Sequence, residues 1–206
     1  MRSLFAFLVV FAAINQVSSR DFGRNWKRAG EGLKTKYTDA NQTLHQLINT
    51  GPIDKFILRS PRYSNTTKYG IVLLVISAAN EVNLRAEIRL QWAARHASIN
   101  LMTGKAFVIF LVGRDLQSSA QLESEAMAHG DLLQVDIEET YRNLVYKIEV
   151  GFLWLSKHID SEFVAKIDSD TVVHIDRLYS TLKRYETKKK SNNFMVCSNV
   201  WYAGPI

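Results

Sequence analysis

The chain has 206 residues, of which 47% are hydrophobic and 22% are charged. That composition is typical of one ordinary globular domain and excludes a disordered or fibrous protein. The formal net charge is +6, but the Lys and Arg residues are scattered and are not interleaved with aromatic residues, so no nucleic-acid partner is expected. The single Cys197 excludes an intrachain disulfide, so the hydrophobic core must hold the fold together.

Residues 1–19 have the layout of a secretory signal. Arg2 precedes an apolar run from residue 4 to residue 14, and the small residues Val17 and Ser19 follow it. These 11 apolar residues are fewer than the roughly 20 that span a bilayer. We therefore expect cleavage after Ser19, with a short uncleaved signal-anchor that attaches the chain to the membrane as the alternative. Either form would deliver the rest of the chain to the lumen of the secretory pathway.

Residues 20–67 are polar and mixed, which favours a stem or linker. Only the apolar positions between residues 44 and 48 have helical spacing in this stretch. Two N-glycosylation sequons begin at Asn41 and Asn65, and both lie in polar surroundings where an oligosaccharide would be accessible. The sequons agree with passage through the secretory pathway.

From residue 68 onward, short apolar runs alternate with segments of helical periodicity. This alternation predicts an α/β fold in which helices cover a sheet. The helix after the first strand can begin at Glu81 or Asn83, and Trp92 is expected to pack it against the sheet. The predicted strands cover residues 71–76, 106–112, 132–135, 163–167 and 194–200, and the predicted helices lie near 83–92, around 122–127 and at 141–158.

Two carboxylates, Asp168 and Asp170, directly follow the predicted strand 163–167. In extended backbone alternate side chains point the same way, so both carboxylates can face one ligand. Paired carboxylates repel each other unless a cation neutralises them, and a divalent ion with oxygen ligands can do so while it binds a diphosphate. The alternative is a plain turn in which the Asp side chains cap backbone N–H groups.

Four blocks of the chain resemble, in order, the β-1,3-galactosyltransferase family, which includes β-1,3-N-acetylglucosaminyltransferases and is related to the fringe enzymes. The resemblance covers about residues 70–206 and is confined to the N-terminal, donor-binding part of that family. The blocks are Arg85 to Trp92, Phe110 to Gly113, Glu123 to Lys147, and Lys166 to Val173.

The resemblance implies a fold, an activity and a location. The fold would be a glycosyltransferase A-type, Rossmann-like mixed sheet flanked by helices, with residues 68–206 as its nucleotide-sugar-binding part. The activity would be a metal-dependent, inverting hexosyltransferase that moves galactose or N-acetylglucosamine from a UDP-sugar to a glycan acceptor on a glycoprotein or glycolipid. The location would be the Golgi membrane or lumen, and the chain could form homo- or hetero-oligomers.

The resemblance also implies roles for individual residues. Asp168 and Asp170 would form a site for Mn²⁺ or Mg²⁺, with Asp170 as the direct ligand and Asp168 beside the ribose or the water shell of the metal. Arg85 and Arg89 would lie near the nucleotide, although an exposed helical Arg more simply forms a surface salt bridge. Residues that would neutralise phosphate charge are Lys147 and Lys166.

The chain departs from the family pattern in two ways. Ser169 stands where the family generally has the middle of three consecutive Asp residues, while the outer pair is kept. The family's catalytic domain also continues past the position of Ile206, which leaves the fold apparently truncated at its C-terminus. A general base is needed to deprotonate the acceptor hydroxyl, and we expect it to be absent from this chain. The alternative function is therefore an inactive truncated relative that binds a nucleotide sugar or a partner protein.

Overall fold

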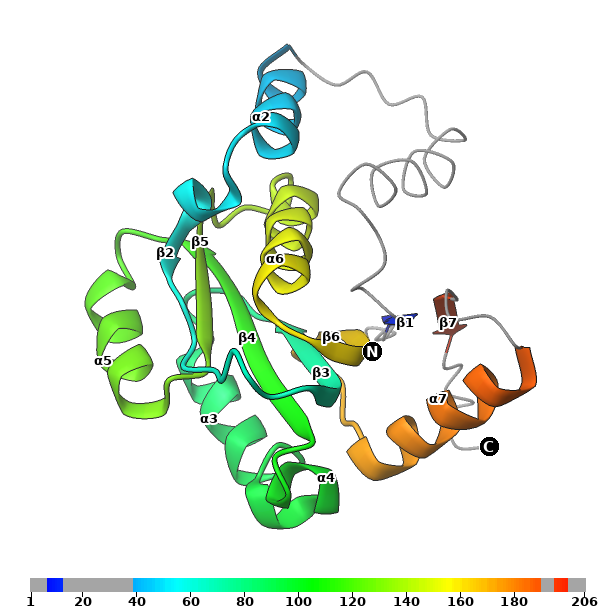
Figure 1. The fold of residues 1–206 in the computed structure, drawn as a ribbon. Helices are drawn as coiled ribbons and strands as arrows, with labels where there is room; N and C mark the ends of the chain where they lie inside the picture. The colour runs from blue at the N-terminus through cyan, green and yellow to red at the C-terminus, as the bar shows by residue number, and fades with distance from the viewer. Residues whose placement is uncertain (1–6, 13–38, 190–194, 200–206) are drawn as a thin grey trace, which may run out of the picture.

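The computed structural model describes residues 7–12, 39–189 and 195–199, with side chains described for residues 44–187 (Figure 1). Strands and helices alternate along most of this length. The strands are β1 (Phe7–Ala12), β2 (Ile57–Arg59), β3 (Tyr69–Ile76), β4 (Ala106–Arg114), β5 (Leu132–Glu138), β6 (Ser161–Asp168) and β7 (Met195–Asn199). The helices are α2 (Asp39–Thr50), α3 (Val82–Leu90), α4 (Ile99–Met102), α5 (Ser119–His129), α6 (Leu144–His158) and α7 (Ile175–Lys189), with the short 3₁₀ helices η2 (Ile53–Phe56) and η3 (Arg95–Ala97).

The strands within the described ranges form one mixed sheet of seven strands, in the order β2-β5-β4-β3-β6-β1-β7. Strands β5, β4, β3 and β6 are parallel. Strand β2 pairs antiparallel with β5 at one edge, and β1 pairs antiparallel with both β6 and β7 at the other. The chain is therefore an α/β protein with a mixed sheet, as the sequence predicts.

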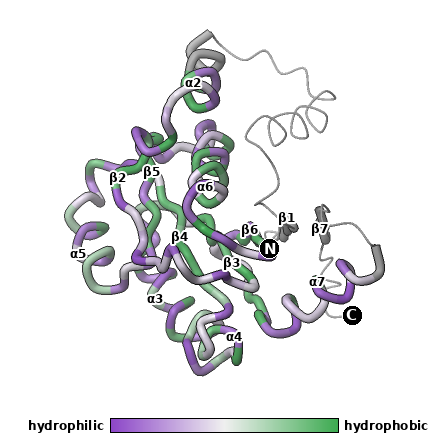
Figure 2. Tube along the Cα trace, in the orientation of Figure 1, coloured by the Kyte–Doolittle hydropathy of each residue, from purple (hydrophilic) through white to green (hydrophobic). Residues whose placement is uncertain are grey.

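Helices cover both faces of the sheet, which makes its central strands continuous runs of buried hydrophobic residues. Every residue of β3 is buried. Helices α3, α5 and α7 pack on one face through Ile88, Leu122 and Leu182, and α2 and α6 pack on the other through Ile48 and Leu155. Figure 2 shows hydrophobic residues gathered in the central strands and in α6.

The strand order reverses between β3 and β6. Helices α3 and α5 lie on the same face and carry the chain from β3 to β4 and on to β5, whereas α6 crosses the opposite face and returns it to β6 (Figure 1). In open α/β sheets, the crevice at the carboxyl ends of the strands beside such a reversal is where ligands bind. The fold thus directs attention to the segments that follow Ile76 and Asp168.

The predicted strands and helices from residue 68 onward are confirmed, with shifts of a few residues at their ends. Helix α6 begins at Leu144, three residues after the predicted start at Tyr141, and Asn143 is its N-cap residue. Helix α7 was not predicted from the sequence, since its buried residues Ile175, Tyr179 and Leu182 form only a narrow apolar stripe on an otherwise polar segment.

Four described elements lie in segments that the sequence assigns to other roles. Helices α2 and η2 and strand β2 fall within the predicted stem of residues 20–67, so the folded part begins before residue 68. Strand β1 falls within the predicted signal of residues 1–19, and the signal itself stays a prediction. Across the described ranges, none of the helices has both the length and the apolar character that crossing a bilayer requires.

Candidate functional site

The two predicted metal ligands lie at the carboxyl end of β6. Asp168 is the last residue of the strand and pairs in register with Ile76, the last residue of β3. Asp168 forms an ion pair with Lys166, whereas Asp170 lies exposed in the turn that follows. Within the described part of the chain, the Asp170 carboxylate has no hydrogen-bond or ion-pair partner. The turn therefore offers one carboxylate that is held by the protein and one that is free for a ligand.

The loop after β3 lies directly beside this turn. The backbone N–H of Ser169 donates to the carbonyl of Ile76 over 3.2 Å, and the Ser169 hydroxyl donates to Oε2 of Glu81 over 3.1 Å. Both contacts cross the point where the strand order reverses. The structure thus brings the ends of β3 and β6 together at the position that the topology marks for a ligand.

Arg85, a residue of α3, is completely buried, and all of its N–H groups donate hydrogen bonds to protein acceptors. It forms a two-point ion pair with Glu125, with donor–acceptor distances of 2.8 Å and 2.7 Å. The remaining N–H groups donate to three groups of the loop after β3: the hydroxyl of Ser77 and the carbonyls of Ala78 and Ala79. All five guanidinium donors are thereby used. Arg85 is buried, not a surface salt-bridge residue, and it fixes the loop that faces the Asp168–Asp170 turn.

Arg89 extends the same network toward the surface. It donates through two nitrogens to Asp131, both at 2.8 Å or less, and donates to Glu125 over 2.7 Å, while its guanidinium lies 4.6 Å from the centre of the Phe110 ring. Burial alone would lower the pKa of Arg89, but the hydrogen bonds and charges of Asp131 and Glu125 outweigh it and raise the pKa. Burial would likewise raise the pKa of Glu125, and its bonds to Arg85 and Arg89 instead lower it. The two basic and two acidic side chains of this network thus pair with one another.

Lys147 is also buried, and it links the loop after β3 to Glu139, the residue that follows β5. Its ammonium donates to the carbonyl of Ser77 over 3.1 Å and to Glu139 over 2.5 Å. The second oxygen of Glu139 accepts from the backbone N–H of Gly113 over 2.6 Å. A Cβ at Gly113 would lie 2.8 Å from that carboxylate oxygen and 2.7 Å from the carbonyl of Ile137, so only glycine fits there.

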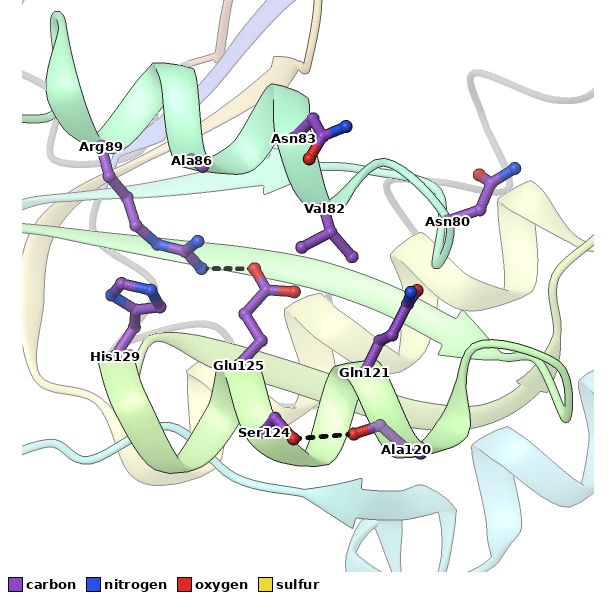
Figure 3. A pocket seen from close by; sticks show the side chains of 10 residues that line it. All are labelled: Asn80, Val82, Asn83, Ala86, Arg89, Ala120, Gln121, Ser124, Glu125 and His129. Atoms are coloured by element: carbon purple, nitrogen blue, oxygen red, sulfur yellow. Dashed lines mark hydrogen bonds and ion pairs between the residues drawn. The ribbon is translucent and has the colours of Figure 1, made fainter.

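A cleft of about 650 Å³ runs between α3 and α5 (Figure 3). Arg89 and Glu125 lie in it, joined by their ion pair, and His129 lies near Arg89. Asn80 and Gln121 contribute amide groups to its lining. The cleft lies over the buried network and includes neither of the carboxylates at the end of β6.

The two carboxylates at the turn are oxygen donors of the kind that bind a hard divalent cation, but they are too few to fill its coordination shell. Among residues 44–187 no group of three or more His, Cys, Asp or Glu side chains is arranged to hold a metal. Asp168 and Asp170 supply oxygen donors of the kind that Mg²⁺ and Mn²⁺ prefer, and sites that share a cation with substrate phosphates use one or two carboxylates. The hydroxyl of Thr171 in the same turn is buried without a hydrogen-bond partner in the described part of the chain. These residues therefore fit a cation whose remaining ligands come from a diphosphate and water.

The structure places the predicted site residues in two groups. Asp168, Asp170 and Lys166 lie together at the end of β6, where the sequence locates the site. Arg85 and Lys147 lie behind the loop after β3, and each is already paired with a carboxylate. Their predicted contacts with nucleotide and phosphate, and that of Arg89, stay predictions.

Three carboxylates of the site region, Glu81, Glu125 and Glu139, were not singled out from the sequence as functional. The sequence predicts for Glu81 only that it can open α3, and it does take the N-cap position there. Their roles depend on partners up to 88 positions away in sequence, as between Glu81 and Ser169. No local pattern carries that information, although Glu125 and Glu139 lie within a block that resembles the glycosyltransferases.

The remaining predicted residues lie outside the site. Trp92 is buried in the core between α3 and the sheet, as predicted. Asn65 is exposed in a bend before β3, and Asn41 lies in α2 with its side chain outside the described residues. Glycosylation at both sequons stays a prediction. The side chain of Cys197 also lies outside the described part.

The doubly wound sheet and its reversal between β3 and β6 place the chain among the doubly wound α/β proteins, a class in which ligands bind at the carboxyl ends of the strands. A family model described as "Galactosyltransferase" matches residues 83–202. The chain belongs to this family of glycosyltransferases.

Curated relatives agree with the family. The chain is 32% identical to β-1,3-galactosyltransferase 4 of Mus musculus over 114 residues, which cover 54% of this chain and 30% of that protein. It is 31% identical to β-1,3-galactosyltransferase 4 of Homo sapiens over 120 residues, and 26% identical to β-1,3-galactosyltransferase 1 of Mus musculus over 166 residues. The last match covers 77% of this chain and 49% of that protein. The chain thus spans between about a third and a half of the length of these relatives.

Proposed function

We propose that this chain binds a UDP-sugar at the carboxyl ends of β3 and β6 and supplies the donor-binding part of a metal-dependent, inverting hexosyltransferase of the secretory pathway. The observation that carries the proposal is the free Asp170 carboxylate beside Asp168, at the reversal of strand order in a chain of the galactosyltransferase family. The relatives are β-1,3-galactosyltransferases by name, which supports galactose as the sugar, with N-acetylglucosamine as the alternative.

The residues of the turn have distinct parts in this function. Asp170 would bind a divalent cation directly, and Asp168, held by Lys166, would bind the cation's water shell or the ribose. When bound, Mn²⁺ or Mg²⁺ stabilises the negative charge that develops on the leaving diphosphate. The buried Arg85 and Lys147 fix the loop after β3 against which the nucleotide would lie.

The acceptor would be a glycan on a glycoprotein or glycolipid, in the Golgi membrane or lumen. An inverting transfer also needs a general base near the acceptor hydroxyl. The proposal for this chain therefore centres on donor binding and assigns no residue to that step.

Calorimetric titration with UDP tests the proposal. The full chain is titrated with UDP in the presence and absence of Mn²⁺, and the titration is repeated with Asp170→Ala and with Glu87→Ala. Glu87 is an exposed carboxylate of α3 without a partner in the described residues, so it controls for the loss of one negative charge. We expect binding that requires Mn²⁺, that Asp170→Ala abolishes and that Glu87→Ala leaves unchanged.

Titration of the same samples with UDP-galactose and UDP-N-acetylglucosamine then identifies the donor sugar. A folded wild-type protein that binds no UDP under any of these conditions would contradict the proposal. Binding that persists in Asp170→Ala would move the site away from the turn.

A further inference from the structure

Glu81 lies between the two segments that meet at the proposed site. Its Oε2 accepts three hydrogen bonds: from the Ser77 hydroxyl over 3.0 Å, from the backbone N–H of Ala78 over 2.9 Å and from the Ser169 hydroxyl over 3.1 Å. The first two donors belong to the loop after β3, and the third belongs to the turn after β6. One carboxylate oxygen thus links the two sides of the reversal in strand order.

We propose that Glu81 is a positioning residue for the Asp168–Asp170 turn and that it acts through the hydroxyl of Ser169. This inference rests on the proposed function and adds a residue to it. Ser169 lies between the two carboxylates, so a bond that fixes Ser169 also fixes the backbone from which Asp168 and Asp170 project. Glu81 itself contributes no ligand to the cation in this proposal.

Of the two segments that Glu81 links, only the loop after β3 is held in place by buried side chains. Ser77 is held from beneath, because its hydroxyl accepts from Arg85 over 2.8 Å and its carbonyl accepts from Lys147 over 3.1 Å. Both of these cations are buried. The turn after β6, in contrast, is partly exposed and lies at the surface. The rigid loop therefore holds the turn through Glu81, and not the reverse.

The chemistry of the contact makes Ser169 and Glu81 a matched pair. A hydroxyl at residue 169 donates to the Glu81 carboxylate. A carboxylate at residue 169 would instead face the carboxylate of Glu81 at close range, and like charges at that distance repel unless one is protonated or neutralised. A neutral amide at residue 81 would remove this conflict, because it can donate a hydrogen bond to the new carboxylate.

A double-mutant cycle with Ser169→Asp and Glu81→Gln tests the pairing. Titration calorimetry measures UDP affinity in the presence of Mn²⁺ for the wild-type protein, the two single variants and the double variant. We expect Ser169→Asp to weaken binding about tenfold, Glu81→Gln to weaken it by about threefold or less, and the double variant to recover to within about threefold of wild type. Glu87→Gln serves as the matched control, with the same charge change on the exposed side of α3 and no expected effect.

The free energy of unfolding of the same four proteins, measured without UDP or Mn²⁺, shows whether the contact between Glu81 and Ser169 contributes to stability. Coupling in stability together with coupling in UDP affinity supports the positioning role. Coupling in stability alone makes the contact purely structural and overturns the inference. Binding that is as tight or tighter in Ser169→Asp, or single effects that simply add in the double variant, also overturns it.

The two proposals fail in different ways. If the wild-type protein binds UDP with Mn²⁺ and Asp170→Ala abolishes it, the donor site stands whatever the cycle shows. If the folded wild-type protein binds no UDP, the proposed function fails and the positioning role fails with it.

Discussion

Two groups of charged side chains in this molecule differ in how far the protein itself satisfies them. Under α3 and α5, Arg85, Arg89, Glu125 and Asp131 pair with one another, and every N–H group of Arg85 has an acceptor. At the end of β6, Asp170 has no partner among the described residues. The sequence predicts a ligand-binding role for Arg85 and Arg89 in the first group and for Asp170 in the second. This difference teaches how to distinguish the two roles. A charged side chain whose hydrogen-bonding groups all have protein partners stabilises the fold, whereas one without protein partners is available to bind a ligand.

The largest effect on stability should follow from breaking the buried network at Arg85. Arg85→Ala leaves Glu125 without its two-point partner and removes all the hydrogen bonds that Arg85 makes to the loop after β3. Breaking a buried ion pair by removing one partner costs about 3–5 kcal/mol. We expect the free energy of unfolding, measured by urea denaturation, to fall by about that amount.

Arg177→Ala is the control for this change, since Arg177 is exposed on α7 and its side chain has no partner in the described residues. The free energy of unfolding of that variant should stay within about 0.5 kcal/mol of wild type. A loss from Arg85→Ala no larger than that of the control would mean that the network is not structural.

Asp176 provides a third case for the comparison. It is a carboxylate near the surface, yet its oxygens accept several hydrogen bonds from the protein. Its oxygens accept from the hydroxyl of Ser98, from the backbone N–H groups of Ile99 and Asn100, and from the amide of Asn100, and these bonds dock α4 against α7. Burial alone would raise the pKa of Asp176, but the hydrogen bonds outweigh it and lower the pKa to about 2.

The lowered pKa of Asp176 predicts a pH dependence of stability. A carboxyl whose pKa is lower in the folded state stabilises the protein above its unfolded pKa, and this contribution is lost as the pH falls through the folded pKa. The loss should therefore occur between pH 3.8 and about pH 2. Urea denaturation at a series of pH values should show the advantage of wild type over Asp176→Asn shrinking across that window. Parallel curves for the two proteins would contradict the role assigned to Asp176.

Much of the fold could be predicted from the sequence because its signals are local. The run from Ile71 to Ile76 is apolar throughout, and this identifies a strand buried on both faces. The apolar stripe of α6 and the position of Asp168 and Asp170 after a buried strand are equally local. The α/β class and the placement of the two carboxylates at a strand end could be predicted from these patterns.

The rest depends on contacts between distant segments. Arg85 and Lys147 look like ligand-binding cations in sequence, and only the fold shows that Glu125 and Glu139 pair with them from 40 and 8 positions away. The role of Glu81 depends on Ser169, 88 positions away. Strand β2, with three residues, is too short for its alternation to be distinguished from a linker.

The most direct test of the contrast between the two regions is to locate bound Mn²⁺ by nuclear magnetic resonance. Paramagnetic Mn²⁺ broadens the backbone amide signals nearest to it, and the spectrum is recorded with UDP present and with diamagnetic Mg²⁺ as the reference. We predict the strongest broadening at Ser169, Asp170 and Thr171 and much weaker broadening at Gln121 and Ser124 in the cleft between α3 and α5. Broadening centred on that cleft, or on no part of the folded protein, would contradict the assignment of the ligand site to the turn after β6.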